Sequence, residues 1–229
     1  MSAKSQFPLY LASSSPRRQQ LLTRAGISFE LLLAPVDEEA LTADYTGPLD
    51  GLGQYLATAK AMEARGVLVR GGKWGRILAA DTTVLLDGRS LAKPRDLGEA
   101  ADMLAALRNR EHIVATGVAL ADLNGCVKAA TSRTRVLMRN YSDAEIARYV
   151  ATGDPLDKAG AYSIQHPDFE PVERAYGCYL GVMGLPMCLV ATMLHRPEVP
   201  EAGSCPWSGV CTAPFPTSEN PELASDSLP

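Results

Sequence analysis

Residues 7–26 read FPLYLASSSPRRQQLLTRAG: a short apolar run, three serines, a proline, two arginines and then a helix-type pattern. The run at 7–12 predicts a buried strand, and the apolar periodicity that follows Pro16 predicts a helix over about 16–25. Proline suits the first helical turn, because the N–H that it lacks would be unpaired there. A strand that passes directly into a helix is typical of domains in which helices pack on a sheet.

The polar join between this strand and this helix has two interpretations. Free N–H groups and the helix dipole at a helix start favour an anion, and Arg17 and Arg18 add planar charged groups suited to phosphate oxygens. Alternatively, a serine merely caps the helix and the basic turn is solvated. The local residues by themselves slightly favour the simple cap.

The rest of the chain alternates helix-type and strand-type patterns. Asp87-Gly88 and Asn124-Gly125 stand between strand-type runs and predict two hairpins. Asp96 and Ser142 are predicted helix N-caps, each followed three residues later by a glutamate. The remaining predictions are a strand at 28–34, a polar loop at 35–51, helices at 51–70, 96–110 and 142–153, and finally a short strand, a turn at 184–186 and a last helix. These patterns predict an α/β or α+β domain with a mixed sheet.

Composition limits the class of protein. The 229 residues are 46% hydrophobic and 21% charged with a net charge of -4, which suits one core or two small lobes around a cleft. The acidic balance disfavours non-specific nucleic-acid binding. No apolar run reaches membrane-spanning length, and the N-terminal apolar piece is too short for a secretory signal, so a cytoplasmic location is expected. We expect a domain at 1–195 and a flexible Pro/Ser-rich tail at 196–229.

Several catalytic and metal-binding patterns are missing from the sequence. The five cysteines are an odd number, which argues against a disulfide framework. Cys205 and Cys211 in the tail could pair or bind metal, but their spacing differs from that of a zinc knuckle. The chain contains no HExxH, G-x-S-x-G or P-loop pattern, so zinc-hydrolase, α/β-hydrolase and P-loop readings are unsupported.

Acidic residues in two segments are candidates for chemistry. Asp81 follows the apolar run ILAA, where a carboxylate facing a cleft could bind a divalent metal or act as a general base. Asp37, Glu38 and Glu39 could supply another oxygen ligand for Mg²⁺ or Mn²⁺. Taken singly, a turn aspartate and a solvated acidic loop are the simpler interpretations.

Three lysines stand near the ends of predicted segments. They are Lys60 in LATAKA, Lys93 in LAKPRD and Lys158 in PLDKAGAYSIQ. Each by itself is expected to be solvated. If their segment ends face one cleft, however, their point charges would suit a polyphosphate.

Six motifs, taken in order, resemble one family. LASSSPRRQQLL, VDE, LATAKA, AADTTV with LAKPRD, HIVATGVAL and YVATGDPLDKAGAYSIQ follow one another as in the Maf family of nucleoside triphosphate pyrophosphatases. The resemblance extends from about Leu9 to Leu194. It implies two α/β lobes around a deep cleft, similar to the inosine triphosphate pyrophosphatases, and hydrolysis of a nucleoside triphosphate with a divalent cation, Mg²⁺ or Mn²⁺.

The resemblance also implies roles for individual residues. Asp81 matches the proton acceptor and, with Glu38, a metal ligand. Arg17, Thr82 and Gln165 match positions that tune the choice of base, and Arg18 is expected to hold phosphate. The other expected members of the phosphate and metal cleft are Ser13, Lys60, Lys93 and Lys158.

The expected substrate follows from the same motifs. Arg17, Thr82 and DKAGAY-IQ resemble the dTTP/UTP pyrophosphatases, whereas the 7-methyl-GTP branch usually carries tryptophan at the position of Arg17. After Gln165, however, this chain continues HPDFEPVERAYGCYLG where those members have a glycine-rich stretch. A broad-specificity pyrophosphatase is therefore the near alternative, and a non-catalytic nucleotide-binding regulator of cell division is the second. A homodimer is expected from the frequency of two-fold oligomers.

Overall fold

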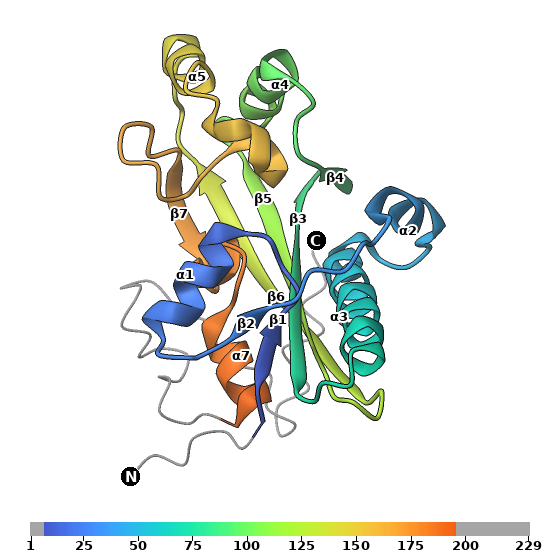
Figure 1. Ribbon diagram of the computed structural model, residues 1–229. Helices are drawn as coiled ribbons and strands as arrows, with labels where there is room; N and C mark the ends of the chain where they lie inside the picture. The colour runs from blue at the N-terminus through green and yellow to red at the C-terminus, as the bar shows by residue number, and fades with distance from the viewer. Residues whose placement is uncertain (1–6, 196–229) are drawn as a thin grey trace, which may run out of the picture.

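The computed structural model describes residues 7–195, which form a mixed sheet with helices packed around it (Figure 1). The strands are β1 (Leu9–Leu11), β2 (Glu30–Leu31), β3 (Arg76–Leu86), β4 (Arg89–Leu91), β5 (Glu111–Ala121), β6 (Val127–Met138) and β7 (Val172–Tyr176). The helices are α1 (Pro16–Arg24), α2 (Glu38–Asp44), α3 (Leu52–Arg70), α4 (Leu97–Leu107), α5 (Asp143–Val150), α6 (Tyr179–Val182) and α7 (Met187–Leu194), with short 3-10 turns η1 (Leu49–Gly51), η2 (Asp154–Asp157) and η3 (Ala159–Ala161).

The sheet of the described residues has seven strands in the order β2-β1-β3-β5-β6-β7, with β4 paired to β3. β1 runs parallel to β2 and β3, whereas β3, β5, β6 and β7 are antiparallel neighbours. The predicted α/β class with a mixed sheet and flanking helices is therefore confirmed.

The core divides along the three long strands. Figure 1 shows α1 and α7 on one side of the sheet, α3 on the other, and α4 and α5 at its upper end. Successive residues of a strand face opposite sides, so Leu78 packs with the α1 and α7 cluster while Ala79 packs with α3. A separate apolar cluster gathers Val84, Leu104 and Tyr149 at the upper end. The molecule thus has an upper and a lower lobe that share β3, β5 and β6.

Local signals placed most elements correctly. Asp96 accepts a hydrogen bond from the backbone N–H of Glu99 at the start of α4. Ser142 and Glu145 form a complete capping box at the start of α5. The hairpins turn at Asp87-Gly88 and around Gly125, as predicted, since both turns need positive φ angles.

Three local predictions were wrong. The segment predicted as a polar loop contains α2, which Asp37 caps by accepting from the N–H of Ala40, and whose exposed faces carry no apolar periodicity. The strand expected at 28–34 shortens to Glu30–Leu31. The short strand expected before the last helix is the helical turn α6, which Cys178 caps, and β7 lies before it.

Two glycines let α3 lie directly on the sheet. A Cβ atom on Gly117 of β5 would stand 2.1 Å from the backbone nitrogen of Gln54, and one on Gly53 would stand 2.9 Å from the backbone oxygen of Asp81. Neither distance is possible for a real side chain, so the close approach requires glycine at both places. It brings the first turn of α3 against the middle of β3.

The described helices include none that is long and apolar enough to cross a membrane. Cys205, Cys211 and the predicted tail at 196–229 lie outside the described residues.

Candidate active site

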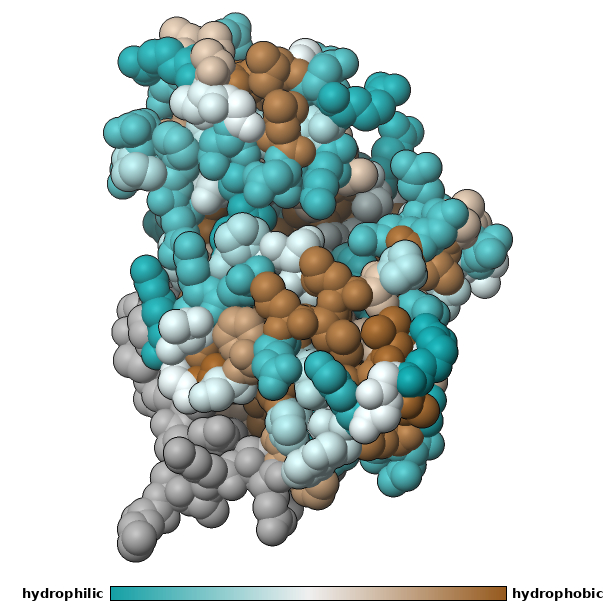
Figure 2. All heavy atoms as spheres, viewed as in Figure 1, coloured by the Kyte–Doolittle hydropathy of each residue, from teal (hydrophilic) through white to brown (hydrophobic). Residues whose placement is uncertain are grey.

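A pocket of about 1000 Å³ opens between the two lobes. It is lined by the turn between β1 and α1, by α2 and α3, by β3 and β4, and by the segments 157–165 and 182–184. Figure 2 shows apolar side chains over the middle of this face and a hollow above them, between the upper lobe and α2. The volume is in the range of sites that hold a cofactor-sized molecule.

All ten residues that the sequence nominated line this one pocket. They are Ser13, Arg17, Arg18, Glu38, Lys60, Asp81, Thr82, Lys93, Lys158 and Gln165. Because they come from six separate segments of the chain, only the tertiary fold can gather them. Their surroundings in the pocket differ, and these differences indicate what each can do.

The turn between β1 and α1 is more than a helix cap. Ser15 occupies the N-cap position of α1, but its side chain makes no capping hydrogen bond. Ser13 is buried, and its Oγ atom accepts from the N–H of Ser15 and from Arg18 Nη1, at 3.3 and 3.1 Å. Ser14, Ser15 and Pro16 line the pocket, so the positive end of the α1 dipole opens on it.

The two arginines of this turn have different environments. Arg18 donates from Nε to the carbonyl of Gly184 at 2.8 Å and from Nη2 to Thr82 Oγ1 at 3.3 Å, besides its bond to Ser13. Burial lowers the pKa of the Arg18 guanidinium, although nearby Asp81 favours its charge. Within residues 7–195, Arg17 has a single ion pair, to Asp157 at 3.8 Å. Arg18 therefore ties α1 to the rest of the pocket wall, and Arg17 is the more available cation.

Thr82 is engaged in the same wall. Its Oγ1 atom lies 3.0 Å from Oγ1 of Thr116, and Thr116 donates its own proton to the carbonyl of Gly181. Thr82 must then donate to Thr116 while it accepts from Arg18. The hydroxyl proton of Thr82 is thus donated to Thr116 and not to the pocket.

Asp81, Lys60 and Glu38 form the charged centre of the pocket. Lys60 Nζ lies 2.6 Å from Asp81 Oδ1 and 2.9 Å from Glu38 Oε2. The side chains of Lys60 and Asp81 are each 15% exposed, so this pair is largely screened from bulk water, whereas the Glu38 side chain is 53% exposed. Asp81 Oδ2 accepts no hydrogen bond from residues 7–195. One carboxylate oxygen is thus held in place and the other is available.

Asp81 does not stand where the sequence suggested. The apolar run was expected to end at Asp81, whereas β3 continues five residues further, to Leu86. Asp81 pairs with Gly117 in the middle of the sheet. Strand alternation turns its side chain toward α3, and the close packing of α3 brings Lys60 within reach.

Lys93 and Gln165 lie at exposed positions of the pocket. Neither the Lys93 ammonium nor the Gln165 side-chain amide makes a hydrogen bond or ion pair within residues 7–195. Only the backbone N–H of Gln165 is engaged, with Ser163 Oγ at 3.3 Å. Both side chains are free to meet a ligand.

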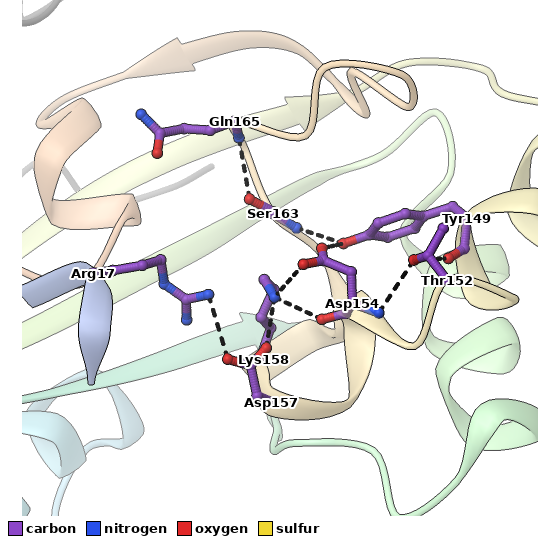
Figure 3. Close-up of polar contacts among 8 residues, drawn as sticks. All are labelled: Arg17, Tyr149, Thr152, Asp154, Asp157, Lys158, Ser163 and Gln165. Carbon is purple, nitrogen blue, oxygen red and sulfur yellow. Dashed lines mark hydrogen bonds and ion pairs between the residues drawn. The ribbon is translucent and has the colours of Figure 1, made fainter. Parts of the chain in front are cut away.

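Lys158, expected to bind substrate in the phosphate cleft, lines the pocket but is buried and engaged by protein groups. It is 7% exposed, and its Nζ atom contacts the carbonyl oxygen and Oδ1 of Asp154 and Oδ1 of Asp157 at 2.6, 2.8 and 2.5 Å (Figure 3). An ammonium group has three N–H donors, and these contacts use all of them. The motif GDPLDKAG supplies both aspartates, a local signal that the sequence-based choice of Lys158 alone did not use.

The structure also shows polar residues behind the pocket that the sequence did not nominate. Thr116 supports Thr82, Tyr149 contacts Asp154 and Ser163, and buried His112 contacts pocket-lining Tyr162. Each contact joins residues that are far apart in the chain or lie inside apolar patterns, so no local pattern marks them.

No cluster of three or more histidine, cysteine, aspartate or glutamate side chains within residues 7–195 could hold a metal ion by itself. Glu38 and Asp81 nevertheless share Lys60 Nζ, so their carboxylates lie close together. Two carboxylates suit Mg²⁺, which usually takes its remaining ligands from water and substrate phosphates. The residues present fit such a cation only together with a bound phosphate compound.

Comparison with known proteins gives a consistent result. Residues 8–197 match the family model described as Maf-like protein. A dTTP/UTP pyrophosphatase of Burkholderia lata is 46% identical over 199 residues, which cover 84% of this chain and 95% of that protein. A dTTP/UTP pyrophosphatase of Cupriavidus metallidurans is 44% identical over 192 residues, covering 82% and 96%. A solved dITP/XTP pyrophosphatase of Mycobacterium abscessus is 21% identical with a TM-score of 0.36, covering 58% of this chain and 73% of that one. The match to the family model over nearly the whole described region, together with the Burkholderia and Cupriavidus relatives, shows that the chain belongs to the Maf family.

Proposed function

We propose that this chain hydrolyses nucleoside triphosphates to a nucleoside monophosphate and pyrophosphate, prefers dTTP and UTP, and removes unwanted nucleotides from the cytoplasmic pool. The observation that carries the proposal is the single pocket that gathers the available carboxylate of Asp81 with the cations Lys60, Lys93 and Arg17. Relatives of the same family and nearly the same length are named dTTP/UTP pyrophosphatases.

Asp81 is the proposed general base. Its Oδ1 atom is fixed by Lys60, and its Oδ2 atom can accept a proton from water. The water oxygen forms a new bond to phosphorus at the anhydride between the α- and β-phosphates, and the bridging P–O bond breaks. The proton of the water passes to Asp81, and pyrophosphate leaves with the electron pair of the broken bond.

The cations of the pocket would neutralise the phosphates. Within residues 7–195, Lys93 makes no ion pair, and Arg17 has only a long, exposed contact to Asp157. The family resemblance assigns Arg17 to the choice of base, and its charge would also act on a nearby phosphate. The N-terminus of α1 adds the unpaired backbone N–H groups of its first turn. Arg18 supports this end of the pocket by fixing α1 against Gly184 and Thr82.

A divalent cation, Mg²⁺ or Mn²⁺, is part of the proposal. Glu38 and Asp81 would hold it together with phosphate oxygens. Bound there, it would offset the charge that develops on the phosphates.

Residues 163–165 of the pocket lining carry no charged side chain and suit the base; this segment is called the neutral end below. Its residues are Ser163, Ile164 and Gln165, and the Gln165 amide can both donate and accept a hydrogen bond. The O4/N3 edge of uracil or thymine offers an acceptor beside a donor, which such an amide can meet. This complementarity supports a pyrimidine preference.

A panel of nucleoside triphosphates with Mg²⁺, with Mn²⁺ and with no metal tests the proposal by measuring pyrophosphate release. We expect the highest kcat/KM for dTTP and UTP, and no release after the metal is removed. Equal rates for all bases would replace the pyrimidine preference with broad specificity. Failure to release pyrophosphate from any of them would favour a binding protein without this activity.

The Asp81→Asn substitution tests the general base. We expect kcat to fall by about 10²–10⁴-fold, because a positioned base typically contributes this much. Asp87→Asn is the matched control: it makes the same change in the adjacent turn, outside the pocket, where Asp87 pairs with Arg110. Full activity in a folded Asp81→Asn protein would remove Asp81 from the mechanism.

A further inference from the structure

A chain of polar contacts behind the pocket begins at Lys158 (Figure 3). The buried Lys158 ammonium is held by the carboxylates of Asp154 and Asp157, as described above. All three N–H donors of Lys158 are used, and its side chain is only 8% exposed. Its positive charge is therefore compensated by protein groups within the pocket wall. Lys158 thereby fixes the position of Asp154.

Tyr149 connects Asp154 to the neutral end of the pocket. Its hydroxyl donates to Asp154 Oδ2 at 2.6 Å and accepts from the backbone N–H of Ser163 at 3.0 Å. Burial raises the pKa of the Tyr149 hydroxyl above its usual range, so it keeps the proton that it donates to Asp154. The ring of Tyr149 is buried and stacks on Phe169 with centroids 4.4 Å apart. The hydroxyl is thus held from both sides.

The segment that follows is held by few contacts, and this hydroxyl makes one of them. Residues 163–165 belong to no helix or strand. Ile164 packs on the apolar clusters, and the carbonyl of Ser163 accepts from the N–H of His166 at 3.3 Å. Ser163 is held through its N–H by Tyr149, and its Oγ atom in turn accepts from the N–H of Gln165. In Figure 3 the Gln165 side chain extends away from these contacts, and its amide makes no hydrogen bond within residues 7–195.

We propose that Tyr149 is a positioning residue for base selection: through Ser163 it sets where the amide of Gln165 stands in the pocket. This proposal rests on the proposed function, since it assumes that the neutral end receives the base. A misplaced amide would still allow phosphate binding and hydrolysis. It would, however, discriminate less between the hydrogen-bonding edges of pyrimidine and purine bases.

Tyr149→Phe is the test, because it removes the hydroxyl and keeps the ring that stacks on Phe169. The matched control is Tyr141→Phe. Tyr141 is also buried, also packs on Phe169 with ring centroids 5.0 Å apart, and donates to the carbonyl of Leu104. Within residues 7–195 its hydroxyl makes no hydrogen bond to the segment 163–165. Both variants lose one buried hydroxyl, but only one of them loses the link to Ser163.

The measured quantity is the ratio of kcat/KM for dTTP to that for GTP. We expect Tyr149→Phe to lower this ratio about tenfold, the effect of one lost hydrogen bond, with kcat for dTTP changed by less than about threefold. Tyr141→Phe should keep the ratio within about twofold. A second variant, Ser163→Ala, removes the acceptor for Gln165 and should lower the ratio in the same direction.

An unchanged ratio in a folded Tyr149→Phe protein would overturn the proposal, and so would an equal fall in Tyr141→Phe. Binding separates this failure from that of the proposed function. If the wild-type chain released no pyrophosphate, the ratio of the dissociation constant for dTTP to that for GTP would still have to rise in Tyr149→Phe and not in Tyr141→Phe.

Discussion

Mild acid should destabilise this fold through one buried histidine. His112 on β5 is 3% exposed, and its Nε2 atom lies 2.8 Å from the hydroxyl of Tyr162. Its Nδ1 atom is buried without a hydrogen-bond partner in the described part of the chain. The imidazolium would carry an N–H at Nδ1 that no acceptor meets, so burial lowers the pKa of His112 from 6.5 to about 4.

The sign and size of the effect follow from linkage. Between pH 6.5 and about 4 the unfolded chain binds a proton at His112 that the folded chain refuses, so stability is highest above pH 6.5 and falls as the pH falls. Each pH unit in this window is worth about 1.4 kcal/mol. Going from about pH 7.5 to about pH 5 should therefore lower the free energy of unfolding by about 2 kcal/mol, or Tm by about 4–8 °C.

Carboxylates contribute little in this window. Hydrogen bonds from the backbone of Ser142 and from Arg139 lower the pKa of Glu145 from 4.5 to about 2, so its stabilising effect is lost mainly below about pH 4.5. The range from about pH 5 to about pH 7.5 thus isolates His112 from this group.

Urea unfolding followed by circular dichroism at both pH values measures the effect. The variant His112→Gln keeps a hydrogen-bonding group near Tyr162 but cannot titrate. We expect the wild-type chain to lose about 2 kcal/mol and the variant less than about 0.5 kcal/mol. If the variant lost as much stability as the wild-type chain, the assignment of the acid effect to His112 would be wrong.

Two further substitutions test the packing behind the pocket. Gly117→Ala should cost more than about 2 kcal/mol in urea unfolding, because its Cβ would press on the backbone of Gln54, whereas Gly66→Ala within α3 meets only the flexible end of Arg70 and should be neutral or stabilising. Equal stability of the two variants would contradict the close packing of α3. Lys158→Met should cost about 1.5–3 kcal/mol and leave KM for the triphosphate within about threefold. Unchanged stability with a raised KM would mean that the Lys158 ammonium reaches the substrate instead.

Features that depend on a few neighbouring residues could be predicted from the sequence. The caps at Asp96 and Ser142 and the two hairpin turns were predicted correctly, because each depends on side chains within four residues and on backbone angles that glycine or a short polar residue accepts. The helix α2 was missed because it buries no residue and so shows no apolar periodicity.

The partners of the site residues could not be predicted from their neighbours in the sequence. The sequence nominated the ten residues and the pocket gathers them, but it did not reveal their partners. Arg18 was expected to hold phosphate, and three of its five N–H donors are directed to Ser13, Thr82 and Gly184. Lys158 was expected to join the phosphate cleft, and its ammonium is buried between two aspartates.

The sequence by itself determined the residue types, the local elements and the family, whereas the tertiary structure decided which charges are available. Thr82 and Gly184 reach Arg18 from 64 and 166 residues away, and Asp81 meets Lys60 only because Gly53 and Gly117 let α3 lie on the sheet. The physical reason is that burial and hydrogen-bond partners are properties of the packed chain. A charged side chain has the same chemistry in any sequence window, but its availability depends on what the fold places beside it.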